Sequence, residues 1–106
     1  MNPKVQKVID HMNANLHRKL VLKGLAKLAR LSRSRLCCVF KEETGMSVGR
    51  YLKSLRIAKA GDLLETTSLS TKEIRSSVGI LDHSHFVRDF KKRHDVTPSE
   101  YREKKT

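Results

Sequence analysis

The chain has 106 residues, of which 38% are hydrophobic and 5% aromatic, so its length suits one compact domain or two very small lobes that share a core. Lys and Arg number 23 against 11 Asp and Glu, and this net charge of +12 indicates a polyanionic partner: DNA, RNA or an anionic membrane surface. The sequence excludes a transmembrane span, because it holds no run of about 18 apolar residues. Its start, "MNPKVQKVID", lacks the apolar segment of a secretion signal. The two cysteines are adjacent and cannot cross-link a fold, so we expect a reducing, cytoplasmic compartment.

The chain is predicted to be all-α, because helix start and stop signals recur and no segment alternates as a strand does. The first helix runs from about Pro3, which suits a first helical position, to about Asn15. Its apolar stripe consists of Val5, Val8, Ile9 and Met12.

The next segment has the order of a helix-turn-helix. A short helix at about 22–29 and a tight turn at 30–31 come before a longer helix. Ser32 is a good N-cap for that longer helix, and Gly45 is a good left-handed residue at its end.

A long helix follows, capped by Ser47 and reaching about Thr66. At about 100° per residue, one side of its first half carries Val48, Tyr51, Leu52, Leu55 and Ala58. The other side of its second half carries Ile57, Ala60, Leu63 and Leu64. We therefore expect this helix to pack against both lobes.

The short helix, turn and longer helix then occur a second time. Ser70 caps the short helix, with Glu73 three residues later as in a capping box. Gly79 makes the turn, Asp82 caps a helix to about residue 94, and the pair at 97–98, Thr-Pro, opens the last helix. The two copies keep a fifty-residue offset from Leu31 and Leu81 onward; before that point they align only if the second turn is one residue longer.

The two longer helices present similar faces. Their apolar anchors are Leu36 and Phe40 in the first copy and Phe86 and Phe90 in the second. The opposite faces carry Ser34, Cys38 and Lys41, then Ser84, Arg88 and Lys91, with Cys37 and Val87 at the flanks.

Short polar residues with one Arg and one Lys suit entry into a DNA groove, where Arg can bind guanine O6 and N7. Arg33, Arg35 and Lys92 at the margins can reach phosphates. Solvated helix faces are the plainer interpretation, but the doubled arrangement favours DNA.

The segments "FKEETG", "YLKSLRIAKAGDLL" and "VTPSEYR", in this order, make the chain resemble the DNA-binding domain of the AraC/XylS family of transcription regulators. The resemblance covers nearly the whole chain. It implies seven helices in two homeodomain-like helix-turn-helix subdomains, at 1–46 and 67–106, joined by a linker helix at 47–66. It also implies that the two recognition helices enter successive major-groove segments on one face of DNA.

The resemblance further implies the residues of the site. Base-contacting positions correspond to Ser34, Arg35, Cys37 and Cys38, then Ser84, His85, Val87 and Arg88. We expect phosphate contacts from Arg33, Lys41, Arg50, Lys91, Lys92 and Arg102. Promoter DNA is the expected partner, with RNA polymerase a second one. Family members usually carry a separate effector-binding or dimerisation domain; we expect the chain to be a carboxy-terminal fragment or a stand-alone small regulator.

The chain departs from the family pattern at four positions. Arg30 stands where the turn often has Gly, Arg75 replaces a small residue, Ile80 an aromatic one, and Val21 the usual cap. The Arg75 position normally allows close helix packing, so its long stem is expected to extend outward.

Metal, redox and catalytic roles are not favoured. Cys37 and Cys38 point about 100° apart on a helix, and His83 and His85 about 160° apart, so neither pair suits chelation. We interpret the cysteines as small groove-facing residues, although flanking arginines could lower a thiol pKa and a thiol sensor stays an alternative. No phosphate loop, metal motif or nucleophile–base–acid set occurs, so we expect no cofactor and no enzyme activity. Non-specific nucleic-acid binding through basicity alone is the other alternative.

Overall fold

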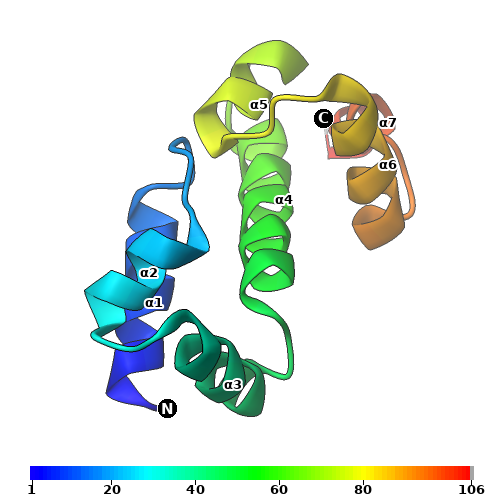
Figure 1. Ribbon diagram of the computed structural model, residues 1–106. Helices are drawn as coiled ribbons and strands as arrows, with labels where there is room; N and C mark the ends of the chain where they lie inside the picture. Colours follow the sequence, from blue (N-terminus) through cyan, green and yellow to red (C-terminus); the bar gives the residue numbers. More distant parts are fainter. Residues whose placement is uncertain (106) are drawn as a thin grey trace. The chain divides into compact units, whose positions relative to one another are not determined.

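The computed structural model describes residues 1–105, with no side-chain description for Lys105, and it confirms the all-α prediction for those residues (Figure 1). The described chain forms seven helices: α1 Pro3–Ala14, α2 Leu22–Ala29, α3 Arg33–Thr44, α4 Val48–Thr66, α5 Thr71–Val78, α6 His83–His94 and α7 Pro98–Lys105. It divides into two compact units, Met1–Ser54 and Leu55–Thr106, each with one helix-turn-helix. Helix α4 starts in the first unit and ends in the second.

The predicted caps are confirmed. Ser32 Oγ accepts a hydrogen bond from the Arg35 backbone N–H at 3.0 Å, and Gly45 adopts a left-handed φ of 76° at the end of α3. Ser70 and Glu73 form a complete capping box at α5. Because each cap satisfies backbone groups that a helix end leaves without partners, these local signals place the helix boundaries.

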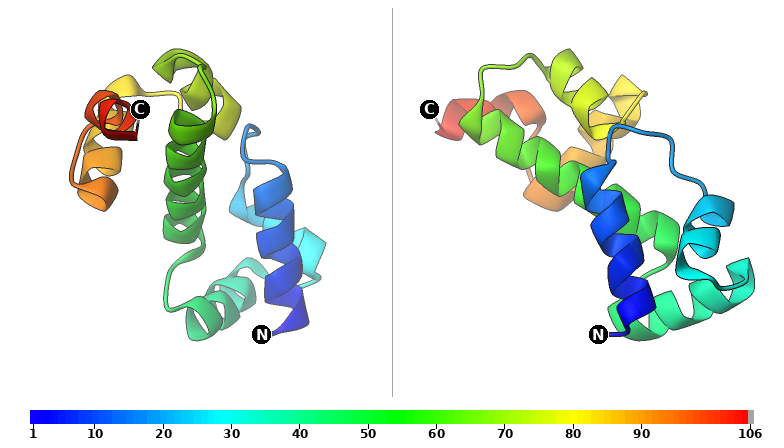
Figure 2. Two further views of the ribbon diagram at one scale, coloured as in Figure 1. Left: turned by 180° about the vertical axis from the view of Figure 1, so that it is seen from behind. Right: turned by 90° about the vertical axis from the view of Figure 1, so that its left-hand side faces the viewer.

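In the first unit, α1, α2 and α3 pack on one another, as the views of Figure 2 show. All four residues of the predicted α1 stripe are buried, and Phe40 of α3 meets Tyr51 of α4 edge to face, with ring centroids 5.2 Å apart. The backbone N–H of Asn2 donates to Glu43 Oε1 at 3.0 Å and so joins the start of α1 to the end of α3. Helix α3 is therefore held on its inner side along most of its length.

The second unit has its own core, against which the late apolar face of α4 packs as predicted. Its buried members are Ile57, Ala60, Leu64, Ile74, Val78, Phe86 and Phe90. The OH of Tyr101 in α7 donates to Glu65 of α4. His94 lies against Gly61, where an added Cβ would be 3.2 Å from its Nε2 atom.

Candidate nucleic-acid interface

Helix α3 turns a polar face to solvent. Ser34, Arg35, Cys37 and Cys38 are all exposed, and Leu36, Val39 and Phe40 are buried on the inner side. Both cysteines are free thiols, and Cys38 Sγ donates to Glu42 Oε1 at 3.5 Å. The thiols are thus surface groups of α3, as the predicted helical phase required.

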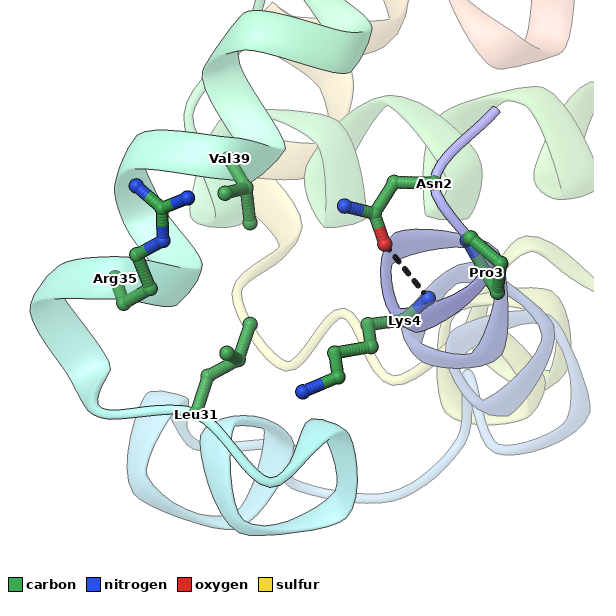
Figure 3. Close-up of a pocket in the computed structure, with 6 residues that line it drawn as sticks. All are labelled: Asn2, Pro3, Lys4, Leu31, Arg35 and Val39. Carbon is green, nitrogen blue, oxygen red and sulfur yellow. Dashed lines mark hydrogen bonds between the residues drawn. The ribbon is translucent and has the colours of Figure 1, made fainter.

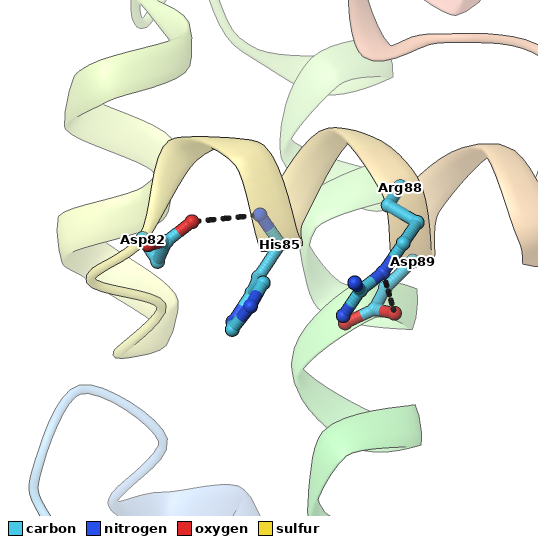
Figure 4. A network of polar contacts seen from close by, with 4 residues as sticks. All are labelled: Asp82, His85, Arg88 and Asp89. Carbon is cyan, nitrogen blue, oxygen red and sulfur yellow. Dashed lines mark hydrogen bonds and ion pairs between the residues drawn. The ribbon is translucent and has the colours of Figure 1, made fainter.

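Helix α6 of the second unit presents the corresponding face. Ser84, His85 and Arg88 are exposed and Val87 is half-buried, over the buried Phe86 and Phe90. Figure 4 shows Asp82 Oδ1 accepting from the His85 backbone N–H at 2.8 Å, and Arg88 Nε 3.7 Å from Asp89 Oδ1. Helix α6 therefore begins at a fixed cap and carries an arginine near the middle of its outer face.

The surroundings of Asp82 lower the pKa of its carboxyl. The His85 backbone N–H that it accepts holds the pKa of the Asp82 carboxyl below its usual value, and the positive charges of His85 and Arg75 act in the same direction. A carboxylate at a helix N-terminus also complements the helix dipole. Both effects favour the ionised carboxylate as the cap of α6.

Five of the six residues expected to contact phosphates are exposed cations: Arg33, Lys41, Arg50, Lys91 and Lys92. Arg102 is placed differently from that expectation. Its guanidinium donates to three backbone carbonyls of its own unit, Leu64 at 3.3 Å, Leu69 at 2.6 Å and Thr67 at 3.1 Å. These donors hold the end of α4 and the loop between α4 and α5, so we expect Arg102 to support the second unit rather than to contact phosphate.

A groove of about 360 Å³ lies beside α3 in the first unit. It is lined by Asn2, Pro3, Lys4, Leu31, Arg35 and Val39, which come from the start of α1, the turn and α3 (Figure 3). Arg35 of α3 and Lys4 of α1 give it a positive rim. An anionic chain lying along α3 would meet this rim as well.

Two further findings concern metal-binding clusters and membrane-spanning helices in the part of the chain that the structure describes. It contains no group of three His, Cys, Asp or Glu side chains placed to hold a metal ion. None of its helices is long and apolar enough to cross a membrane.

The structure adds site features that sequence reasoning missed. Asp89 pairs with Arg88, and Arg75 Nη1 donates to the Leu81 carbonyl at 2.7 Å. The sequence does contain a signal for the contact between Arg75 and Leu81. Arg75 stands at a position of close helix packing, and the turn after it is one residue longer than the turn of the first unit. The structure confirms the longer turn: three residues separate α2 from α3, and four separate α5 from α6.

The chain is similar to known transcription regulators. A sequence model described as "Helix-turn-helix domain" matches residues 25–104. The lactose operon transcription activator of Staphylococcus xylosus is 32% identical over 96% of this chain and 37% of its own length. The transcriptional activator RhaR of Mannheimia succiniciproducens is 30% identical over 93% of this chain and 36% of its own. The chain thus spans little more than a third of the length of these relatives.

Solved structures agree with the sequence comparisons. A transcriptional regulator of Chromobacterium violaceum with an AraC-type DNA-binding domain aligns with a TM-score of 0.91 and 29% identity, over 98% of this chain and 93% of its own. The DNA-binding domain of the global transcriptional factor AdpA, solved in complex with a target DNA, aligns with a TM-score of 0.89 and 25% identity, over 94% and 90% of the two chains. With its seven helices, two helix-turn-helix units and these relatives, the chain belongs to the AraC/XylS family of transcription regulators as a helix-turn-helix DNA-binding domain.

Proposed function

We propose that the chain recognises a specific sequence of double-stranded DNA with two recognition helices, α3 and α6, which enter successive major-groove segments. The observation that carries the proposal is that both helices bury one apolar face and expose short polar residues with cations on the other. An α-helix fits the major groove, and small outward side chains let its backbone approach the base edges.

The two copies are proposed to read DNA with unequal strength. In α6, Arg88 offers a guanidinium for guanine O6 and N7, with Ser84, His85 and Val87 beside it. In α3 the corresponding position is Cys38, which has a weak donor. We therefore expect sharper base preference under α6 and looser, shape-dependent preference under α3.

The phosphate contacts are proposed to come from Arg33, Lys41, Arg50, Lys91 and Lys92, which are exposed cations on or beside the two recognition helices. Arg35 is proposed to contact bases together with Ser34, Cys37 and Cys38, and its place at the margin of α3, with Lys4 across the groove beside it, also brings it near phosphates. These contacts neutralise the DNA backbone and position the helices without selecting a sequence.

Transcription regulation is the biological role that the similarity to activators supports. We propose subdomains at 1–46 and 67–106 with a linker helix at 47–66, and we propose that effector sensing and RNA polymerase contact accompany DNA binding in the full regulator. Transcription from a promoter that carries the selected site, measured in vitro with and without the protein, tests the regulatory role.

Selection of binding sites from random DNA tests the central proposal. The expected result is a short conserved sequence with two half-sites, bound at least 10³-fold more tightly than random duplex at one salt concentration. Equal affinity for selected and random duplexes would instead support non-specific binding through basicity alone.

A further inference from the structure

The turns of the two helix-turn-helix units differ by one residue, and hydrogen bonds show where. In the first turn the Leu31 N–H donates to the Ala26 carbonyl at 3.0 Å; in the second the Ile80 N–H donates to the Arg75 carbonyl at 2.9 Å. Ile80 thus takes the place of Leu31 after the short helix, and Leu81 takes its place directly before the N-cap of the recognition helix. One residue in the first unit corresponds to two in the second.

Because of the extra residue, the Leu81 side chain does not pack against the core of the second unit. Leu31 is half-buried and lines the groove beside α3, and Ile80 is half-buried against the second core. Leu81 is 91% exposed, more than either of the other large exposed apolar residues, Met1 and Val21. A single exposed leucine is common on protein surfaces; its position directly before a recognition helix is what makes this one informative.

Arg75 fixes the backbone that carries this side chain. Its Nη1 atom donates to the Leu81 carbonyl at 2.7 Å. The corresponding residue of the first unit, Ala26, is 3% exposed and carries no donor that could do this. The long arginine and the longer turn therefore occur together, and the turn residue before α6 is held with its apolar side chain outward.

On the basis of the proposed function, we infer that Leu81 is an additional DNA-reading residue, which packs against the C5-methyl group of a thymine at the edge of the α6 half-site. We assign Arg75 as the residue that positions it. The first residues of a recognition helix are those nearest the base edges, so a side chain directly before the N-cap reaches the same groove. Thymine offers the apolar group on a major-groove edge, and an apolar side chain is what reads it. Leu81 has no hydrogen-bonding group with which to bind phosphate.

The test uses the selected site with each thymine of the α6 half-site replaced in turn by deoxyuridine, which lacks only the C5-methyl. The wild-type protein should lose about fourfold in affinity at one of these positions, the loss expected for one buried methyl group. Leu81→Ala should bind the thymine duplex more weakly and show no preference for thymine over deoxyuridine at that position. Val21→Ala is the matched control, because it shortens an exposed apolar residue before α2 and should keep the preference.

The positioning role of Arg75 is tested with Arg75→Met on the same duplexes. This change keeps a long unbranched side chain and removes the donor to the Leu81 carbonyl. It should abolish the thymine preference while the melting temperature shows a folded protein, and Leu81→Ala added to it should cost nothing further at that position. If Arg75→Met lowered the affinity for thymine and deoxyuridine duplexes equally and so kept the preference for thymine, the positioning role of Arg75 would be overturned. Arg75→Lys provides a second readout if Arg75→Met fails to fold.

The outcomes separate this inference from the proposed function. If the wild type binds the selected site specifically but ignores every deoxyuridine replacement, or if Leu81→Ala keeps the full preference, the thymine contact is overturned and sequence-specific binding stands. If the wild type does not separate selected from random DNA, both are overturned.

Discussion

In the second unit, Arg88 Nε lies 3.7 Å from Asp89 Oδ1, with 66% of the arginine side chain exposed and 15% of the aspartate side chain. The Asp89 carboxylate is mostly buried at the edge of α6, whereas the Arg88 side chain is mostly exposed, and the contact between them is long. An ion pair with a long contact and a solvent-exposed cation contributes little. Arg88 can therefore exchange this contact for a base edge at little cost.

Arg88→Ala should weaken binding to the selected site by about 1–3 kcal/mol and relax the preference at one base pair, because a bidentate contact to guanine is lost. Binding to all single-base variants of the site, measured at one salt concentration, gives both numbers. Arg88→Lys, which keeps the charge without the fork of donors, should lose the base preference and recover part of the affinity. If Arg88→Ala instead weakened cognate and random duplexes equally, Arg88 would be a phosphate contact.

The double variant Cys37→Ser with Cys38→Ser should have a free energy of unfolding within about 0.5 kcal/mol of the wild-type value, because both thiols are on the surface. Its DNA affinity should change only mildly. Thermal unfolding and DNA titration measure the two effects. The wild type should bind DNA with the same affinity in reductant and in mild oxidant. If oxidant lowered the affinity of the wild type but not that of the double variant, the result would support the thiol-sensor alternative.

Arg30→Gly should stabilise the first unit by about 0.5–1 kcal/mol, since Arg30 adopts a left-handed φ of 58° that costs any residue with a Cβ. The hydrogen bonds of its backbone N–H to the Ala26 and Lys27 carbonyls survive the change. Gly45→Ala is the converse change. Gly45 has a φ of 76° and an added Cβ would meet no other atom, so the variant should be less stable than the wild type through backbone strain alone. Urea unfolding of both variants checks the pair, and equal stability of Arg30→Gly and wild type would contradict the strain at Arg30.

Stability should fall as the pH drops through the range in which an ordinary histidine titrates, about 6.5. Burial against Phe90 and Tyr101 lowers the pKa of His94, and the charge of Arg93 lowers it further. The carboxylates of Glu65, Asp62 and Asp95 act in the opposite direction. Because the folded pKa is the lower one, the unfolded chain binds a proton first, and the free energy of unfolding decreases toward acid.

His94→Gln removes that titration. Urea unfolding of wild type and variant at several pH values between 8 and 5 should show a steeper decline for the wild type. Parallel curves would mean that the imidazole ionises alike in the folded and unfolded chains.

Insertion of about five base pairs between the two half-sites should reduce affinity toward that of the α6 half-site alone. Half a helical turn rotates one half-site to the opposite face of the duplex, where a single domain cannot reach both. An insertion of about ten base pairs restores the face but not the spacing and serves as the control. Unchanged affinity with the five-base-pair insertion would leave only one helix reading DNA.

Helix boundaries could be predicted because their signals are local. The caps at Ser32, Ser70 and Asp82 each bond a backbone group three residues away, so sequence spacing alone identifies them. The buried and exposed faces of α3 and α6 followed from helical periodicity for the same reason.

Contacts between distant residues could not be predicted in this way. Asn2 and Glu43 are 41 residues apart, and Arg102 is 33 to 38 residues from the carbonyls that it binds. An exposed and a tethered arginine look alike in a sequence, because the difference depends on where folding brings free backbone carbonyls. The phosphate contact that the sequence predicts for Arg102 rests on this ambiguity.

The contacts of Arg102 also affect how binding data on this protein are to be interpreted. Its three hydrogen bonds tie α7 to the end of α4 and to the loop that leads into α5, so the support of the second unit depends on a side chain that need not approach DNA. An alanine at this position would weaken DNA binding and lower the net positive charge together, which mimics the loss of a phosphate contact in a scan of basic residues. A melting curve recorded beside each titration distinguishes the two, because only the loss of support lowers the temperature at which the unbound protein unfolds.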